Sequence, residues 1–327
     1  MSLHMDEDWS DEQPFIPSFS ITESNLLRLD ERMSRADERR ICELSVAAKE
    51  AADEAMRLLD GGMRMDEVLA LMSGTLALPH AILHDDALED NIARLRMRSE
   101  LRRTADEAIF SELFCRALAE ADVRLHESAL LPTAEKDASV AYVKNLYADE
   151  AFDVFSQDRP RMKPVMVRSF SEAVERMRRA EVGYCLFPLE EEGGTRLASV
   201  QSLIYRNDLK IVAVTPVFGY DGTAELTYAL LATSFDPIIY ESTDDLYLEI
   251  ALSREDDATL NAVLTAAQSF GVTVYRADTV SYTSSDGKRT VCSLVLRDYR
   301  HTVFAFLCYL LLFVPDFTPI GLYKNVE

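Results

Sequence analysis

The chain has 327 residues, of which 48% are apolar and 28% charged, and 56 Asp and Glu against 34 Lys and Arg give a formal net charge of −22. This composition is typical of a globular protein of about two or three domains, and it excludes collagen-like, disulfide-rich and wholly disordered chains. The negative charge argues against a nucleic-acid binder, which needs a basic footprint, and against docking on an anionic membrane.

The 5 cysteines include no C-x-x-C pair, so they predict neither a disulfide framework nor a zinc site. Each lies beside apolar residues, and we therefore expect buried, reduced thiols. The first residues lack the pattern of a signal peptide, and the most apolar run, Val303–Val314, is too short to span a bilayer as a helix. These features predict a cytoplasmic protein.

The first part of the chain reads as a tail followed by helices. Residues 1–20 are acidic and without periodicity, which predicts a disordered tail. Apolar side chains then repeat at three- and four-residue steps, and residues 21–128 are predicted to form an all-helical domain. Its predicted helices cover residues 41–60, Met65–Met72 and about Asp85–Ala121.

Two histidines in this part have the spacing of a metal-binding pair on a helix. His80 and His84 stand at i and i+4, followed by Asp85 and Asp86. The sequence indicates no third ligand, so a loop or helix-capping role is favoured. We expect no metal and no cofactor.

After a linker around Pro132 the period of the apolar residues changes. Short apolar runs alternate with amphipathic ones, which predicts a central α/β domain over residues 139–235. The predicted strands are Ser139–Val143, Lys163–Val167, Gly183–Pro188, Leu209–Val214 and Leu226–Ala232, and the predicted helices are Asp149–Phe155, Ser171–Ala180 and Ala198–Arg206.

Residues 240–327 read strand, helix, strand, strand, helix, strand. Asp286-Gly287 is a strong hairpin signal between the two central strands. The order βαββαβ predicts a ferredoxin-like unit. Its second helix would contain the apolar run near Phe304, packed on the sheet.

This succession of parts resembles prephenate dehydratase followed by its ACT regulatory domain, over about Ser139–Glu327. The best local match is Val182–Val217, in which Pro188, Leu189 and Glu190 stand where the family has Pro-Ile-Glu-Asn-Ser. The resemblance implies an α+β multidomain protein. Its middle part would be half of a periplasmic-binding-like dehydratase fold, its C-terminal part ACT-like, and its helical part would stand in the place of a chorismate mutase.

The resemblance also implies site residues. Thr227 matches the threonine of the family's catalytic Thr-Arg-Phe motif. If the protein is active, another arginine such as Arg196 or Arg206 would have to hold the substrate in place of the motif's own. The ligand-binding residues implied are Glu190, Tyr147, Tyr228, Arg196 and Leu260.

Two departures from the family bear on activity. Tyr228 replaces the arginine of the motif, so a bidentate clamp for a substrate carboxylate is lost. The few residues between Val217 and Thr227 leave no room for the family's second lobe. We therefore expect impaired catalysis and a role in binding or regulation by an aromatic amino acid or its precursor, within phenylalanine biosynthesis. The alternative is an active dehydratase, a carbon–oxygen lyase, with a chorismate mutase-like helical domain.

Partners follow from the same patterns. We expect a small aromatic ligand and neither nucleic acid nor membrane. The apolar helices of residues 21–128 are too few to close a bundle by themselves, which predicts a homodimer.

Overall fold

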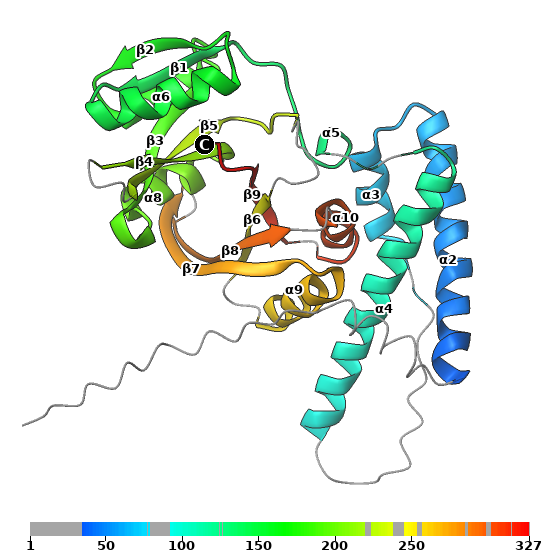
Figure 1. The fold of residues 1–327 in the computed structure, drawn as a ribbon. Coiled ribbons are helices and arrows are strands. Elements are labelled where there is room, and N and C mark those ends of the chain that lie inside the picture. Colours follow the sequence, from blue (N-terminus) through cyan, green and yellow to red (C-terminus); the bar gives the residue numbers. More distant parts are fainter. Residues whose placement is uncertain are drawn as a thin grey trace, which may run out of the picture. The chain divides into compact units, whose positions relative to one another are not determined.

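Figure 1 shows the computed structural model of the chain. It describes residues 35–76, 78, 92–123, 125, 127–219, 224–237, 245–253, 257–284, 287–298, 302–314 and 316–326. The predicted acidic tail and both histidines of the candidate metal pair lie outside these ranges. No described helix is long and apolar enough to cross a membrane.

The described part of residues 35–130 contains helices and no strand. The helices are α2 (Arg35–Asp60), α3 (Met65–Ser73), α4 (Ile92–Glu120) and α5 (Glu127–Leu130). The first three confirm the predicted helices, whereas the single turn α5 was not predicted. Buried Arg40 of α2 donates two hydrogen bonds to Asp106 of α4, at 2.7 and 3.1 Å, and this ion pair sets the two helices side by side.

The alternation of strands and helices in the middle of the chain is confirmed. The strands are β1 (Ser139–Val143), β2 (Lys163–Val167), β3 (Tyr184–Glu191), β4 (Lys210–Phe218) and β5 (Ala224–Ala232), and the helices are α6 (Leu146–Asp158), α7 (Phe170–Arg178) and α8 (Ala198–Arg206). β1, β2 and β3 are parallel, and β5 runs antiparallel between β3 and β4. Helix α6 packs on one face of this sheet, and α7 and α8 pack on the other.

The C-terminal part has the predicted βαββαβ order. Its elements are β6 (Leu246–Ser253), α9 (Asp257–Phe270), β7 (Thr273–Ser284), β8 (Gly287–Asp298), α10 (Val303–Phe313) and β9 (Thr318–Tyr323). The strands lie in the antiparallel order β9-β6-β8-β7. Ser284 pairs with Gly287 across the predicted hairpin turn, whose two central residues lie outside the described ranges.

The two sheets join edge to edge into one sheet of nine strands, because β4 pairs with β9. Ile211 stands opposite Gly321 at this seam. A Cβ atom on residue 321 would lie 2.8 Å from a ring carbon of Tyr323 and 3.0 Å from Cβ of Ile211, so glycine is needed for the strands to approach. Nothing in the sequence pattern predicts this pairing.

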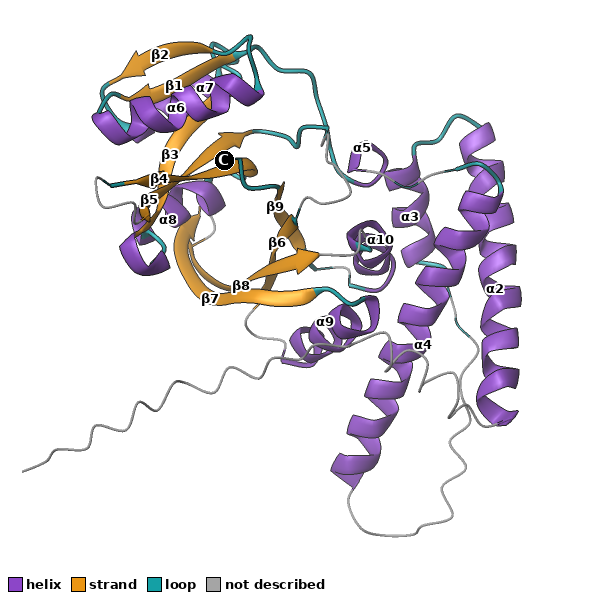
Figure 2. Ribbon diagram, in the orientation of Figure 1, coloured by secondary structure: helices purple, strands orange, loops and turns teal. Residues whose placement is uncertain are grey.

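The helices of residues 35–130 share one hydrophobic core with the C-terminal part. α10 packs against α3, α4 and α9, and α4 also packs against α9 (Figure 2). This explains why the run at Val303–Phe313 is apolar all round: one side of α10 meets the sheet and the other meets helices. The homodimer was expected because the helices of residues 21–128 are too few to bury their own apolar faces. The C-terminal part of the same chain covers these faces, and the homodimer stays a prediction.

The expectation of five buried cysteines is wrong for one of them. Cys185 and Cys308 are buried and Cys115 and Cys292 half-buried, but Cys42 is exposed. The buried face of α2 contains Leu44, Ala48, Ala52 and Ala55. Cys42 precedes Leu44 by two residues, which turns it by about 200° to the solvent side of the helix. None of the five forms a disulfide.

Candidate functional site

The predicted catalytic residue Thr227 lies on β5, directly between two neighbouring strands. It is the register partner of Glu190 on β3 and of Pro216 on β4. Because side chains alternate along a strand, Thr227 and the adjacent Tyr228 point to opposite faces of the sheet. The predicted site residues therefore divide between the two faces.

Tyr228 and Tyr147 share the face covered by α6. Tyr228 is buried, Tyr147 packs beside the same core, and the Tyr228 hydroxyl donates a 3.4 Å hydrogen bond to Asn145 Oδ1. Asn145 also caps α6 by accepting a 2.9 Å hydrogen bond from the backbone N–H of Ala148, so this helix begins three residues before the predicted Asp149. Burial raises the pKa of Tyr228, so the side chain is a neutral phenol.

Arg196 lies on the opposite face, beside Glu190. Its Nε is 2.8 Å from Glu190 Oε1, close enough for an ion pair but not in line for a hydrogen bond. Its Nη2 donates a 3.1 Å hydrogen bond to Glu249 on β6. The side chains of Arg196 and Glu249 are 6% and 1% exposed. Burial alone would lower the pKa of Arg196, but Glu249, Tyr323 and Glu190 together outweigh burial and raise the pKa, so the guanidinium stays charged.

A second arginine completes this buried cluster. Arg276 of β7 donates hydrogen bonds of 2.5 Å to Glu190 and to the backbone carbonyl of Gly194. The hydroxyl of Ser293 on β8 donates to Glu249 at 3.2 Å. The cluster of Glu190, Arg196, Glu249 and Arg276 therefore ties the end of β3 to strands β6 and β7 of the C-terminal sheet. We call these four residues the junction cluster.

Leu260 lies on neither of the two sheet faces that hold the other predicted site residues. It is a half-buried residue of α9, packed in the core that the N-terminal helices share with α10. The structure thus brings Thr227, Glu190 and Arg196 together, places Tyr147 with Tyr228, and leaves Leu260 apart from both groups. The roles implied for these six residues stay predictions.

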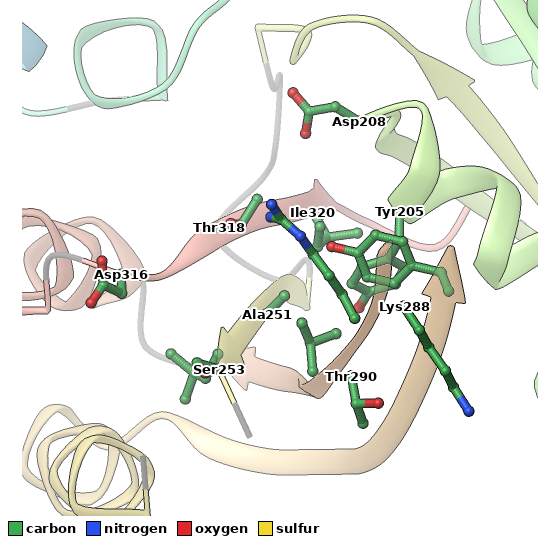
Figure 3. A pocket seen from close by; sticks show the side chains of 13 residues that line it. Tyr205, Asp208, Ala251, Ser253, Lys288, Thr290, Asp316, Thr318 and Ile320 are labelled. Carbon is green, nitrogen blue, oxygen red and sulfur yellow. The ribbon is translucent and has the colours of Figure 1, made fainter. Parts of the chain in front are cut away.

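A cavity of about 790 Å³ opens beside the junction cluster, between α8 and the C-terminal sheet (Figure 3). Tyr205 of α8 and Tyr282 of β7 lie in its wall with their ring centres 5.6 Å apart. The other lining residues are Asp208, Ala251, Leu252, Ser253, Lys288, Arg289, Thr290, Val291, Asp316, Thr318 and Ile320. The cavity adjoins the junction cluster, because its lining residue Ala251 is two positions from Glu249 on the same face of β6. Burial, and next the negative charge of Glu249, raise the pKa of Tyr205.

A second polar junction lies around Asp236, after β5. Lys136 of the linker donates to Asp236 at 2.5 Å and to the backbone carbonyl of Phe235 at 2.9 Å. Arg159 forms an ion pair with the same carboxylate, and the Tyr184 hydroxyl lies 3.1 Å from it. Burial, and next the Asp236 charge, raise the pKa of Tyr184 to about 12.

Sequence patterns alone did not predict the junction cluster or the cavity. One signal was present: Glu249 is a carboxylate in the middle of the apolar strand Leu246–Ser253, and a charge in such a place needs a buried partner. Its partner Arg196 is 53 residues away in the sequence, so the pairing itself required the fold.

No metal site is found in the described part of the chain, where no three His, Cys, Asp or Glu side chains gather in a metal-binding group. Ion pairs lie along α4, where Arg103 pairs with Glu107 at 2.7 Å and Arg116 with Glu112 at 3.2 Å.

Comparison with known proteins yields structural likenesses at low identity. No family model matches the chain, and no curated protein matches it. Among solved structures, prephenate dehydratase from Streptococcus mutans aligns at 14% identity and TM-score 0.45, covering 58% of this chain and 99% of that one. GqqA, described as a novel type of quorum quenching acylase, aligns at 13% identity and TM-score 0.42, covering 57% of this chain and 95% of that one.

A second prephenate dehydratase, from Arthrobacter aurescens and in complex with L-Phe, aligns at 12% identity and TM-score 0.41, covering 57% of this chain and 89% of that one. Values this low do not assign the chain to a family.

Proposed function

We propose that this chain is a prephenate dehydratase-like protein with impaired catalysis, which binds an aromatic amino acid or one of its precursors in a regulatory role. One observation carries the proposal. Arg196, the arginine beside Thr227 and Glu190, has a side chain that is 6% exposed and is held between the carboxylates of Glu190 and Glu249. Its positive charge is already paired with these two carboxylates, so Arg196 is not available to bind a carboxylate of a substrate.

The chemistry of the reaction makes that loss costly. Prephenate carries two carboxylates, and the dehydratase reaction removes water and carbon dioxide to give phenylpyruvate. The residue at the family's arginine position, Tyr228, is a buried neutral phenol. Losing a charged contact to a buried carboxylate costs about 2–5 kcal/mol. If that contact acts in the transition state, the rate falls by roughly 30-fold to several thousand-fold.

The chain path gives the proposal a second support. Only residues 219–223 separate β4 from β5, and these two strands pair directly with each other. The other edge of β4 is occupied by β9. The resemblance places prephenate between two lobes, and this connection is too short to contain another lobe.

The alternative, an active dehydratase, is favoured by one feature. Thr227 is half-buried and stands directly opposite Glu190, so a hydroxyl and a carboxylate are neighbours on one face of the sheet. In that case Thr227 would help protonate the leaving hydroxyl, and Arg196 would have to leave Glu249 to bind substrate.

Phenylpyruvate formation by the full chain separates the two functions. We expect a rate near that of the uncatalysed reaction, and the same rate with Thr227→Ala. Turnover near 10 s⁻¹, lost in Thr227→Ala, would establish the dehydratase instead. In parallel, thermal unfolding with aromatic amino acids and with prephenate tests binding, since a ligand at 100 times its Kd adds about 2.7 kcal/mol to the unfolding free energy.

A further inference from the structure

Two thiols meet where the N-terminal helices pack against the C-terminal part. Cys115 belongs to α4 and Cys308 to α10, and these residues are 193 positions apart in the chain. The two helices lie side by side, with Cα atoms within 8 Å of each other (Figure 1). The thiols of Cys115 and Cys308 form a hydrogen bond with each other. The fold thus brings together two sulfur atoms from distant parts of the sequence.

Aromatic rings next to the two thiols fix the position of α4 against α10. Phe110 of α4 meets Phe313 of α10 edge to face, with ring centres 6.0 Å apart. Phe114, which directly precedes Cys115, stacks on Phe110 at 6.1 Å. The side chains of Phe110 and Phe114 are fully buried. Close packing of this kind leaves the two helices little freedom to separate, so the thiols stay within reach of each other in the folded chain.

The two thiols differ in their access to solvent. Cys115 is half-buried, whereas Cys308 is fully buried in the core that the helices share with the C-terminal part. The hydrogen bond with Cys115, and next burial, raise the pKa of Cys308 well above its usual value, so Cys308 keeps its proton. A small oxidant therefore reaches Cys115 first, while Cys308 lies beside it as a second, protected thiol.

The remaining cysteines are placed differently. Cys42 is exposed on α2. Cys185 is buried beneath α7, and its sulfur lies 3.9 Å from the sulfur of Met177, a thioether that cannot form a disulfide. Cys292 lies on β8 and is half-buried like Cys115, which makes it a matched control for experiments on that thiol.

We propose that Cys115 and Cys308 form a reversible redox site, at which a peroxide oxidises the two thiols to a disulfide between α4 and α10. The Cys115 sulfur attacks one oxygen of hydrogen peroxide and the O–O bond breaks, which gives a sulfenic acid on Cys115 and a water molecule. The Cys308 sulfur then attacks the Cys115 sulfur, the S–O bond breaks, and the S–S bond forms with release of a second water molecule. Each sulfur loses one electron, the peroxide gains two, and both thiol protons leave in the water.

The disulfide joins the N-terminal helices covalently to the C-terminal part, because α4 belongs to the first and α10 to the second. It also restricts the unfolded chain, and this restriction is large because the two cysteines are 193 positions apart. Oxidation therefore stabilises the folded chain, and a reducing dithiol reverses the effect. The inference does not depend on the proposed function, since it needs neither a substrate nor the junction cluster.

Peptide mapping by mass spectrometry on the full chain tests the bond. The reduced, folded chain is treated with hydrogen peroxide, its remaining thiols are blocked with iodoacetamide in urea, and the digest is compared with and without dithiothreitol. We expect the peptides of Cys115 and Cys308 to be linked in the main disulfide product, and dithiothreitol to restore both thiols. The oxidised chain should also unfold at a urea midpoint about 1 M higher than the reduced chain.

Two matched variants test the assignment. Cys115→Ala removes the thiol that meets the oxidant, and Cys292→Ala removes a half-buried thiol of β8. We expect peroxide to leave the urea midpoint of Cys115→Ala unchanged, and to raise that of Cys292→Ala as it does in the unaltered chain. Each variant is compared with its own reduced form, so a change in its basal stability does not affect the comparison.

Several results would overturn the inference. Peroxide might oxidise Cys115 to a sulfinic acid without linking it to Cys308, or the link might form only when peroxide is added in urea; in either case the folded chain has no redox site here. A linked product without a rise in the urea midpoint would overturn the stabilisation of the fold by the bond. The proposed function is decided separately, by measured prephenate turnover.

Discussion

The two faces of the C-terminal sheet are stabilised by different physical means. On the side of α9 and α10, strand β6 presents Leu246, Leu248, Ile250 and Leu252, all buried in the core that includes the N-terminal helices. On the side of α8, the same strand presents Tyr247, Glu249, Ala251 and Ser253. The first face is an apolar layer, and the second contains the junction cluster and the cavity.

The difference indicates which face can respond to a ligand. Apolar burial is non-directional and has no charged group that a small molecule could engage. A buried ion pair contributes only while its geometry is kept, and it is costly once broken. We therefore expect the contacts on the helix side of the C-terminal sheet to stay formed in the folded protein. We expect the contacts on the side of α8 to be the ones that can open or change.

The largest effect is expected from breaking the junction cluster. Arg196→Met leaves Glu249, which is 1% exposed, without its counter-charge. Removing one partner of a buried ion pair costs about 3–5 kcal/mol of unfolding free energy. Urea denaturation of the variant and of the unaltered chain measures this loss.

A double variant serves as the control for that measurement. Arg196→Met combined with Glu249→Leu removes both charges, and such a replacement is often nearly neutral. We expect it to recover at least half of the loss. A loss below about 1 kcal/mol in the single variant would mean that Arg196 is not held in a strong ion pair with Glu249. That result would favour the active dehydratase.

A somewhat smaller effect is expected on the helix side. Leu118 of α4 is fully buried in the shared core, and Leu118→Ala should cost about 2–5 kcal/mol by leaving a cavity. Val46 of α2 is 53% exposed, so Val46→Ala should stay within about 0.5 kcal/mol. If both variants unfold at the same urea concentration, the helices do not share a core with the C-terminal part.

Most of the elements could be predicted from the sequence, because local periodicity determines them. The strand Ser139–Val143 and the helix Ala198–Arg206 have the predicted bounds, and the βαββαβ order is confirmed. Helix α6 was predicted too short, since its cap at Asn145 depends on one side-chain hydrogen bond.

What could not be predicted depends on contacts between distant residues. The β4–β9 seam is set by the approach of Ile211 to Gly321, and these residues are 110 positions apart in the chain. The junction cluster joins Glu190 to Arg276 across 86 positions. No periodicity in the sequence reports such pairs, so the sequence showed a charged residue in an apolar strand without showing its partner.

A smaller effect is expected at the Asp236 junction, where Tyr184 is one of three partners. Tyr184→Phe removes one hydrogen bond while Lys136 and Arg159 still pair with the carboxylate. We expect a loss of about 1 kcal/mol at neutral pH, measured by urea denaturation.

The pH dependence gives this prediction its own control. The pKa of Tyr184 is about 12 in the folded chain and about 10 when unfolded, so the folded state holds the proton more tightly. The resulting stabilisation is complete below pH 10 and is lost as the pH rises through 12. Tyr184→Phe should fall less steeply over that range, and identical slopes would contradict the assigned environment.

The smallest perturbation is alkylation of the native thiols, which compares the two sides of the molecule directly. Cys42 is exposed and should react with iodoacetamide first. Cys185 is buried on β3 beneath α7, and burial raises the pKa of its thiol to about 12, so it reacts only after local opening. Cys308 is buried in α10, on the helix side of the C-terminal sheet.

If the contacts on the helix side of the C-terminal sheet open last, Cys308 should be protected from alkylation until global unfolding. Cys185 should react at a lower urea concentration. Mass spectrometry of peptides across a urea series distinguishes the two thiols. Simultaneous labelling of Cys185 and Cys308 at the denaturation midpoint would mean that the chain opens as one cooperative unit. The contrast between the two faces would then be one of composition alone, without a difference in local stability.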